Sequence, residues 1–193
     1  MAINFSDFQL VNVIDTCSIW NLLSSDKLYS AALNSGCSFT CTRFVTYECL
    51  HKKRKLISSE DLELQERLVK EQKKGRFEEF HITIEDLQDV EILQNSHCIS
   101  KGELSSIAFA KRINQAFLTD DQEARQLASK FMQNELVQTI PHLFGWFFYK
   151  GQFSDSDKEL IITQHEKLKR TLSKHFEKAY LLALEKRLMH LND

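Results

Sequence analysis

Acidic residues stand beside apolar runs at four places in the chain: Asp15, Glu48, Glu103 and the pair Asp120 and Asp121. Asp15 ends the apolar run 11–14 and the pair follows the run 116–119, so both places are carboxyl ends of predicted strands. Because an open α/β sheet gathers its chemistry at these ends, we expect the acids to converge on one crevice. Converging carboxylates repel one another and lose hydration, so a divalent cation is needed to neutralise them. The sequence therefore predicts a metal site of Asp15, Glu48, Glu103 and one or both of Asp120 and Asp121.

Two of these acids also have a purely structural explanation. Glu103 follows Ser100 by three residues, which is the spacing of a capping box at the start of a helix. Asp120 precedes a predicted helix and has Glu123 three positions on, which makes it a good N-cap. With Asp120 as the cap, Asp121 is the better metal-ligand candidate.

Glu48 and Asp15 are harder to explain as structural residues. Phe44, Val45 and Cys49 turn the helix face that carries Glu48 toward the core, where an unpaired carboxylate costs several kcal/mol and needs compensation. Asp15 could cap the helix that follows it, but it directly ends the most hydrophobic strand. That position favours a site at the end of the sheet over a simple cap.

The net charge of −2 combines two segments of opposite sign. Residues 51–76 hold nine Lys or Arg against five acids, and residues 78–103 hold seven acids against one Lys. The basic segment opens with a run of four cations: Lys52, Lys53, Arg54 and Lys55. Such cations hold backbone phosphates, so the run is a candidate nucleic-acid-binding site. Two solvated helix faces are the alternative, and the run alone favours that alternative.

The elements that must position these residues alternate along the chain. Strands are predicted at residues 11–14, 37–40, 80–84, 116–119 and 136–140, the last closed by Pro141. Helices are predicted at 18–34, from 42 onward, and at 62–74, 85–93, 104–113 and 122–132. This alternation predicts an α/β domain over residues 1–150, a three-layer α/β/α arrangement around a parallel sheet.

Residues 151–193 are predicted to form a helical carboxyl-terminal extension, with Ser156 and Glu159 in capping-box spacing. One apolar stripe comprises Leu168, Leu172, Phe176, Ala179 and Ala183; another comprises Leu181, Leu184, Leu188 and Leu191. One isolated helix cannot bury both stripes against a small domain, so we expect two helices or a partner. Just before the extension, residues 143–149 contain six large apolar side chains, which favours core packing over a protein interface.

Composition indicates an ordinary soluble protein, since 42% of the residues are hydrophobic, 27% are charged and only one is Pro. We expect a cytoplasmic location and no membrane partner, because the amino terminus lacks a signal-peptide pattern and no apolar run approaches membrane-spanning length. Five cysteines without scaffold spacing indicate reduced thiols. Cys37, Cys41, Cys49 and His51 could form a zinc set, but buried cysteine is the more usual explanation.

Four short blocks resemble, in order and spacing, the signatures of PIN domains. They are residues 13–18, the isolated Glu48, residues 101–110 and residues 117–121, within a resemblance that covers about residues 9–140. Carried over, Asp15, Glu48, Glu103 and Asp121 would be the acidic site, because the family's last motif is Thr, any residue, Asp. Cys17 stands where family members usually have Asn, and Glu103 stands where Asp is commoner.

The resemblance implies a Mg²⁺- or Mn²⁺-dependent ribonuclease that hydrolyses phosphodiester bonds in line, such as the toxin of a toxin-antitoxin pair. Its implied partner is RNA, although the residues alone do not separate RNA from single-stranded DNA. An inhibitory protein partner and a homo-oligomer also stay open. The alternative is a catalytically silent PIN-like module that binds nucleic acid or protein.

Overall fold

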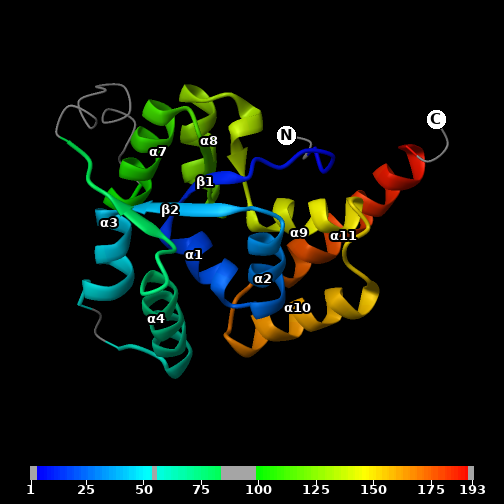
Figure 1. The fold of residues 1–193 in the computed structure, drawn as a ribbon, viewed down its shortest axis with the longest axis horizontal. Coiled ribbons are helices and arrows are strands. Elements are labelled where there is room, and N and C mark those ends of the chain that lie inside the picture. Colours follow the sequence, from blue (N-terminus) through cyan, green and yellow to red (C-terminus); the bar gives the residue numbers. More distant parts are fainter. Residues whose placement is uncertain (1–3, 54–55, 84–98, 191–193) are drawn as a thin grey trace.

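The fold is built on one sheet of five parallel strands, in the order β3-β2-β1-β4-β5 (Figure 1). The computed structural model describes residues 4–53, 56–83 and 99–190. The strands are β1 (Val11–Ile14), β2 (Ser38–Thr42), β3 (Glu78–Phe80), β4 (Ala116–Leu118) and β5 (Val137–Gln138). The chain adds strands outward from β1 on one side and then returns to add β4 and β5 on the other. The strand order therefore reverses between β1 and β4, and ligands of open α/β sheets bind at such a switch point.

The sheet is buried on both faces, which explains why β1 and β4 are apolar apart from the buried Asn12. Val13 and Phe117 are paired in register and belong to one hydrophobic cluster, whereas their neighbours Ile14 and Leu118 belong to another. The first cluster is covered by α7 (Lys101–Ile113) and α8 (Gln122–Phe131). The second is covered by α1 (Thr16–Leu23), α2 (Asp26–Asn34), α4 (Ser59–Gln72) and α9 (Ile140–Tyr149).

Figure 1 shows α7 and α8 on one side of the sheet and α1, α2 and α9 on the other. The predicted α/β fold with an all-parallel sheet flanked by helices is therefore confirmed. The helix predicted at 85–93 lies outside the described residues.

Several predicted boundaries were wrong. The single helix predicted at 18–34 is two helices, because Ser25 starts α2 as an N-cap whose side chain accepts from the Leu28 amide. The helix expected from Thr42 onward divides into α3 (Arg43–Thr46) and a π-helical turn, η1 (Tyr47–His51). β3 begins at Glu78, ahead of the predicted residue 80.

The prediction that Pro141 closes a strand at 136–140 was also wrong. A short 3₁₀ turn, η2 (Asn134–Leu136), leads into β5, and Pro141 lies in the first turn of α9. Proline is tolerated there because the first helical amides have no partner inside the helix. The aromatic run that follows is core, as predicted: Leu143, Phe144, Trp146, Phe147 and Phe148 are buried.

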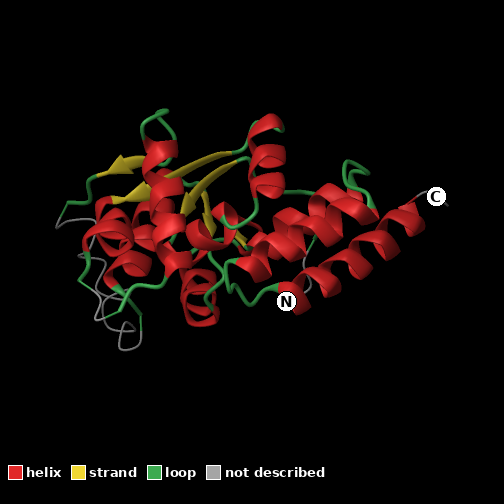
Figure 2. Ribbon diagram, turned by 90° about the horizontal axis from the view of Figure 1, so that it is seen from below, coloured by secondary structure: helices red, strands yellow, loops and turns green. Residues whose placement is uncertain are grey.

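The extension forms two helices, α10 (Asp155–Lys167) and α11 (Ser173–His190). The capping box at its start pairs Ser154 with Asp157, so the predicted Ser156–Glu159 box was wrong. α11 packs along α9, with the rings of Phe144 and Phe176 at 4.7 Å between centroids. Figure 2 shows these long helices lying to one side of the strands.

Only one of the two apolar stripes of the extension is buried. Phe176, Ala179 and Ala183 are buried against the domain, whereas Leu181 and Leu188 are each 63% exposed. No helix within the described residues is long and apolar enough to cross a membrane.

Candidate active site

Asp15 lies at the carboxyl end of β1, at the switch point, and is completely buried. Its Oδ1 accepts a hydrogen bond of 2.8 Å from the Ser18 amide, which makes it the N-cap of α1. Its Oδ2 accepts a bond of 2.5 Å from the hydroxyl of Thr119, which follows β4. Burial, helped by the charge of Asp120, raises the pKa of Asp15 to about 7 despite both bonds.

Asp120 follows the end of β4 and faces Asp15 across the switch point. Its Oδ2 accepts from the Asn21 amide group at 2.7 Å, and its Oδ1 accepts from the Ile140 amide at 3.0 Å. Its own amide donates to Ser18 Oγ. Burial raises the pKa of this carboxyl, although the bond from Asn21 lowers it. Asp120 thus joins β4, α1 and the start of α9.

Asp121, and not Asp120 as predicted, is the N-cap of α8. Its Oδ1 accepts from the Ala124 amide at 2.8 Å, three residues on. The sequence allowed either residue, because both precede the helix by a suitable interval. The buried partners of Asp120 decide between them, since they hold its side chain away from the helix.

Glu48 lies on the π-helical turn η1 and reaches two other elements. Its Oε2 accepts from the Thr16 hydroxyl at 2.9 Å, and its Oε1 accepts from the Gly102 amide at 3.2 Å. A Cβ atom at position 102 would lie only 2.5 Å from Glu48 Oε2. The absence of a side chain at Gly102 therefore makes room for the carboxylate. Glu48 is half-buried, and its two hydrogen bonds compensate for the hydration that it loses.

Glu103 forms the capping box that its spacing suggested. Its Oε2 accepts from the Ser100 amide at 2.8 Å, and Ser100 Oγ accepts from the Glu103 amide. Burial raises the pKa of Glu103, and the charges of Asp121 and Glu48 raise it further. Glu103 thus completes the capping box of α7, and the charges of two other acids also act on its carboxyl.

The structure brings all five acids to one edge of the sheet. Hydrogen bonds link Asp15 to Thr119, next to Asp120, and link Glu48 to residues adjoining Asp15 and Glu103. Repulsion among the carboxylates contributes to the raised pKa of Asp15 and of Glu103. Asp15 is thus coupled to Asp120, and Glu103 to Asp121 and Glu48, through their charges.

The donor chemistry of this cluster fits a hard divalent cation, because Mg²⁺ and Mn²⁺ prefer carboxylate oxygens. The caps use Asp121 Oδ1 and Glu103 Oε2, and the second oxygen of each belongs to neither cap. Within residues 4–53, 56–83 and 99–190, however, no group of three or more His, Cys, Asp or Glu side chains is placed to hold a metal ion.

The remaining predicted groups are the cysteines, which were considered as zinc ligands, and the basic run at residues 52–55. Cys37, Cys41 and Cys49 are buried. Cys17 lies beside the acids, and burial together with the charges of Asp15 and Asp120 raises its pKa to about 12. In the predicted basic run, Lys52 and Lys53 are exposed just after η1, whereas Arg54 and Lys55 lie outside the described residues.

Sequence reasoning missed the residues that hold the acids in place: Thr16, Ser18, Asn21, Gly102, Thr119 and Arg170. Gly102 and Thr119 stand next to an acid in the sequence and could have been suspected. Asn21 and Arg170 gave no such signal, because their contacts are made between distant segments.

The chain matches no protein-family model, no curated protein and no solved structure.

Proposed function

We propose that this chain is a PIN-type nuclease that hydrolyses phosphodiester bonds of RNA with Mg²⁺ or Mn²⁺. The observation that supports it most is the completely buried Asp15 carboxyl at the switch point, whose pKa is raised to about 7 by burial and, to a lesser extent, by the charge of Asp120. A fold that needed only helix caps would gain nothing from burying Asp15 completely beside four half-buried acids. A bound divalent cation would neutralise these carboxylates and so account for their being close together.

Asp15, Glu48, Glu103 and Asp121, assisted by Asp120, would hold the cation. When bound, the ion lowers the pKa of a coordinated water and stabilises the departing oxygen of the phosphodiester. The protein's part is to orient the acids: Ser18 and Thr119 fix both oxygens of Asp15, and Thr16 with the Gly102 amide fixes Glu48. RNA is proposed over single-stranded DNA on the resemblance to PIN domains.

The test is hydrolysis of a single-stranded RNA with Mn²⁺ by the wild type and by Asp15→Asn and Glu48→Gln. Both variants keep the size of the side chain and remove its charge. We expect chelation to abolish wild-type activity and each variant to lose at least about a hundredfold, equivalent to about 3 kcal/mol of transition-state stabilisation.

The matched control is Asp26→Asn, which neutralises a carboxylate that is 72% exposed and pairs with Arg67. This control should cleave at the wild-type rate. Wild-type activity in Asp15→Asn or Glu48→Gln, or activity that persists in excess chelator, would exclude the proposed site.

A catalytically silent PIN-like binding module is the second candidate. It is favoured by the capping roles of Glu103 and Asp121. It is also compatible with the described residues, among which no group of three or more His, Cys, Asp or Glu side chains is placed to hold a metal ion. A silent module predicts no Mn²⁺-dependent rise in melting temperature, whereas a nuclease that binds Mn²⁺ only when folded predicts about 2.7 kcal/mol of stabilisation at a hundredfold excess over Kd.

A further inference from the structure

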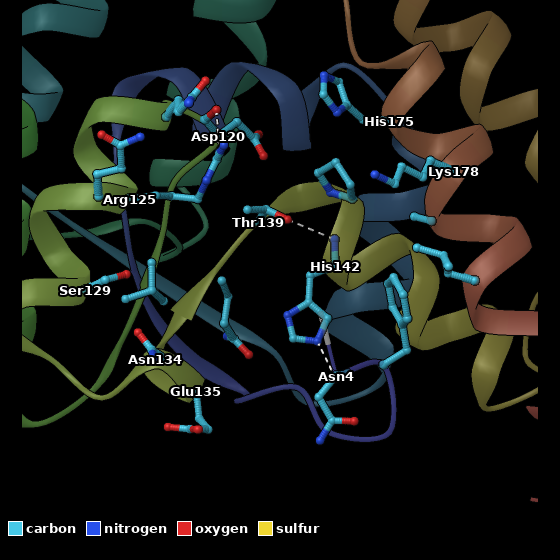
Figure 3. A pocket seen from close by; sticks show the side chains of 18 of the residues that line it. Asn4, Asp120, Arg125, Ser129, Asn134, Glu135, Thr139, His142, His175 and Lys178 are labelled. Atoms are coloured by element: carbon cyan, nitrogen blue, oxygen red, sulfur yellow. Dashed lines mark hydrogen bonds between the residues drawn. The ribbon is translucent and has the colours of Figure 1, made fainter. Parts of the chain in front are cut away.

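A groove of about 1000 Å³ begins at Asp120 and runs away from the acidic cluster. One wall is α8, and the opposite wall is α11 of the extension, with β5 and the first turn of α9 between them. Figure 3 shows Asp120 and Arg125 on one side and His175 and Lys178 on the other. The groove is far larger than a metal ion requires and lies at the upper end of ligand-site volumes.

Cations in the groove gather at the end near the acids. Arg125 is fixed there because its Nη1 donates to the Asp120 carbonyl at 2.7 Å. Lys178 faces it from α11, beside His175. The charged groups that line the whole groove are Arg125, Lys130 and Lys178 against Asp7, Asp120 and Glu135. The positive and negative charges of the whole lining are therefore equal in number. At the end next to the acidic cluster, however, Arg125 and Lys178 are two cations that can bind the phosphates of a nucleic-acid strand.

Farther from the acids the lining changes to amides, hydroxyls and apolar groups. The α8 wall presents Gln126 and Ser129, η2 presents Asn134, and the α11 wall adds Leu182. Amide and hydroxyl groups hydrogen-bond to base edges and sugars, and apolar groups pack against bases. A single strand of nucleic acid presents phosphates, sugars and bases together, so it matches both parts of the lining.

We infer that this groove binds the single-stranded polynucleotide on one side of the phosphate to be cleaved, with Arg125 and Lys178 on its phosphates and the α8 amides on its bases. The inference rests on the proposed function, because Asp120 belongs both to the acidic cluster and to the groove. It gives the extension a direct role, since α11 supplies one wall.

The test compares strand binding with small-ester hydrolysis in the full chain. Binding of a labelled single-stranded RNA is measured by fluorescence anisotropy in chelator, so that no cleavage occurs. Hydrolysis of bis(p-nitrophenyl) phosphate with Mn²⁺ reports the acidic cluster without needing the groove. Lys178→Ala should weaken RNA binding about fivefold at about 0.1 M salt and lower the salt slope by about 0.7, the value of one phosphate contact. Its small-ester hydrolysis should stay at the wild-type rate.

Lys174→Ala is the matched control, because Lys174 is an exposed lysine one turn earlier on α11 and does not line the groove. It should bind RNA like the wild type, and Lys178→Arg should restore binding. Wild-type affinity in Lys178→Ala, equal losses in both lysine variants, or no RNA binding by the wild type would overturn the inference. So would a parallel loss of small-ester hydrolysis in Lys178→Ala. Groove-dependent binding without any metal-dependent hydrolysis would overturn the nuclease proposal and leave the groove in place.

Discussion

At the scale of single residues, the charged form of Asp15 destabilises the folded chain. Its carboxyl has a pKa of about 7 in the folded chain against an ordinary value of 3.8, because it is completely buried. The folded state therefore binds more protons than the unfolded state between these values, and stability falls as pH rises from about 4 to 7. The penalty is complete above pH 7.

Asp15→Asn should therefore raise the metal-free melting temperature at about pH 8 and leave it almost unchanged at about pH 4. The amide keeps an oxygen for the Ser18 amide and offers its NH₂ to Thr119 Oγ, so the packing survives. Thermal unfolding of both proteins in chelator at the two pH values measures the effect.

The control is Asp157→Asn, for which the sign reverses. Asp157 caps α10 and pairs with Lys27, and the hydrogen bond from Lys27 lowers its pKa to about 2. Removing that charge should lower the melting temperature at about pH 8. If Asp15→Asn also melts lower than the wild type there, the acids act as ordinary caps and their repulsion is negligible.

At the scale of elements, the loop between α10 and α11 reaches into the acidic cluster. Arg170 Nε donates to Asn21 Oδ1 at 3.0 Å, and Asn21 Nδ2 donates to Asp120 at 2.7 Å. Because the amide of Asn21 is held at its oxygen, its NH₂ group is directed at the carboxylate. Arg170 is thus a positioning residue that acts through Asn21.

Arg170→Ala should lower kcat for RNA cleavage about fivefold, the equivalent of one hydrogen bond of about 1 kcal/mol, and leave KM unchanged. Steady-state kinetics on the full chain measures both constants. The neighbouring Lys169→Ala is the control, since Lys169 is exposed and pairs with Glu60 on α4. A change confined to KM, or equal changes in both variants, would remove Arg170 from this role.

Periodicity predicted those elements that have one clear apolar face. The helix predicted at 122–132 is α8 (Gln122–Phe131), and the strand predicted at 116–119 is β4 (Ala116–Leu118). It failed at the start of α9, where Ile140 and the residues after it are almost all apolar and show no period. Thr139 is the N-cap of this helix, because its side chain accepts a hydrogen bond from the His142 amide.

The gathering of the acids could be predicted because strand ends in a parallel sheet share one edge. Their individual partners could not, because each depends on segments far apart in the chain. Whether Asp120 or Asp121 caps α8 is settled by Asn21 and Ile140, neither of which lies near them in sequence. The π-helical turn that carries Glu48 likewise has no signal in the alternation of polar and apolar residues.

At the scale of the whole molecule, a buried histidine of the extension forms a hydrogen bond with the domain. His165 on α10 is completely buried, hydrogen-bonds with the Ser24 hydroxyl at the end of α1, and packs edge-on against Phe176 of α11. Burial, together with the charge of Arg170, lowers its pKa from 6.5 to about 3. The unfolded chain binds this proton first, so stability is lost as pH falls from about 6.5 toward 3.

His165→Gln should therefore flatten the acid side of the stability profile. Between about pH 8 and pH 4.5 the wild type should lose about 3 kcal/mol through this one group, and the variant should not. Urea unfolding at both pH values gives the difference, whatever the variant loses overall. Parallel profiles for the two proteins would show that His165 does not titrate on unfolding.

The contact between Arg170 and Asn21 joins residues 149 positions apart, which has a consequence for biosynthesis. Chains are made from the amino terminus at about 5–20 residues per second, so the 50 residues from Asp120 to Arg170 take roughly 3–10 s. During that time the nascent chain contains every proposed metal ligand but lacks Arg170 and the α11 wall of the groove. Full nuclease activity would therefore begin only after Arg170 and α11 have been synthesised and packed against the domain.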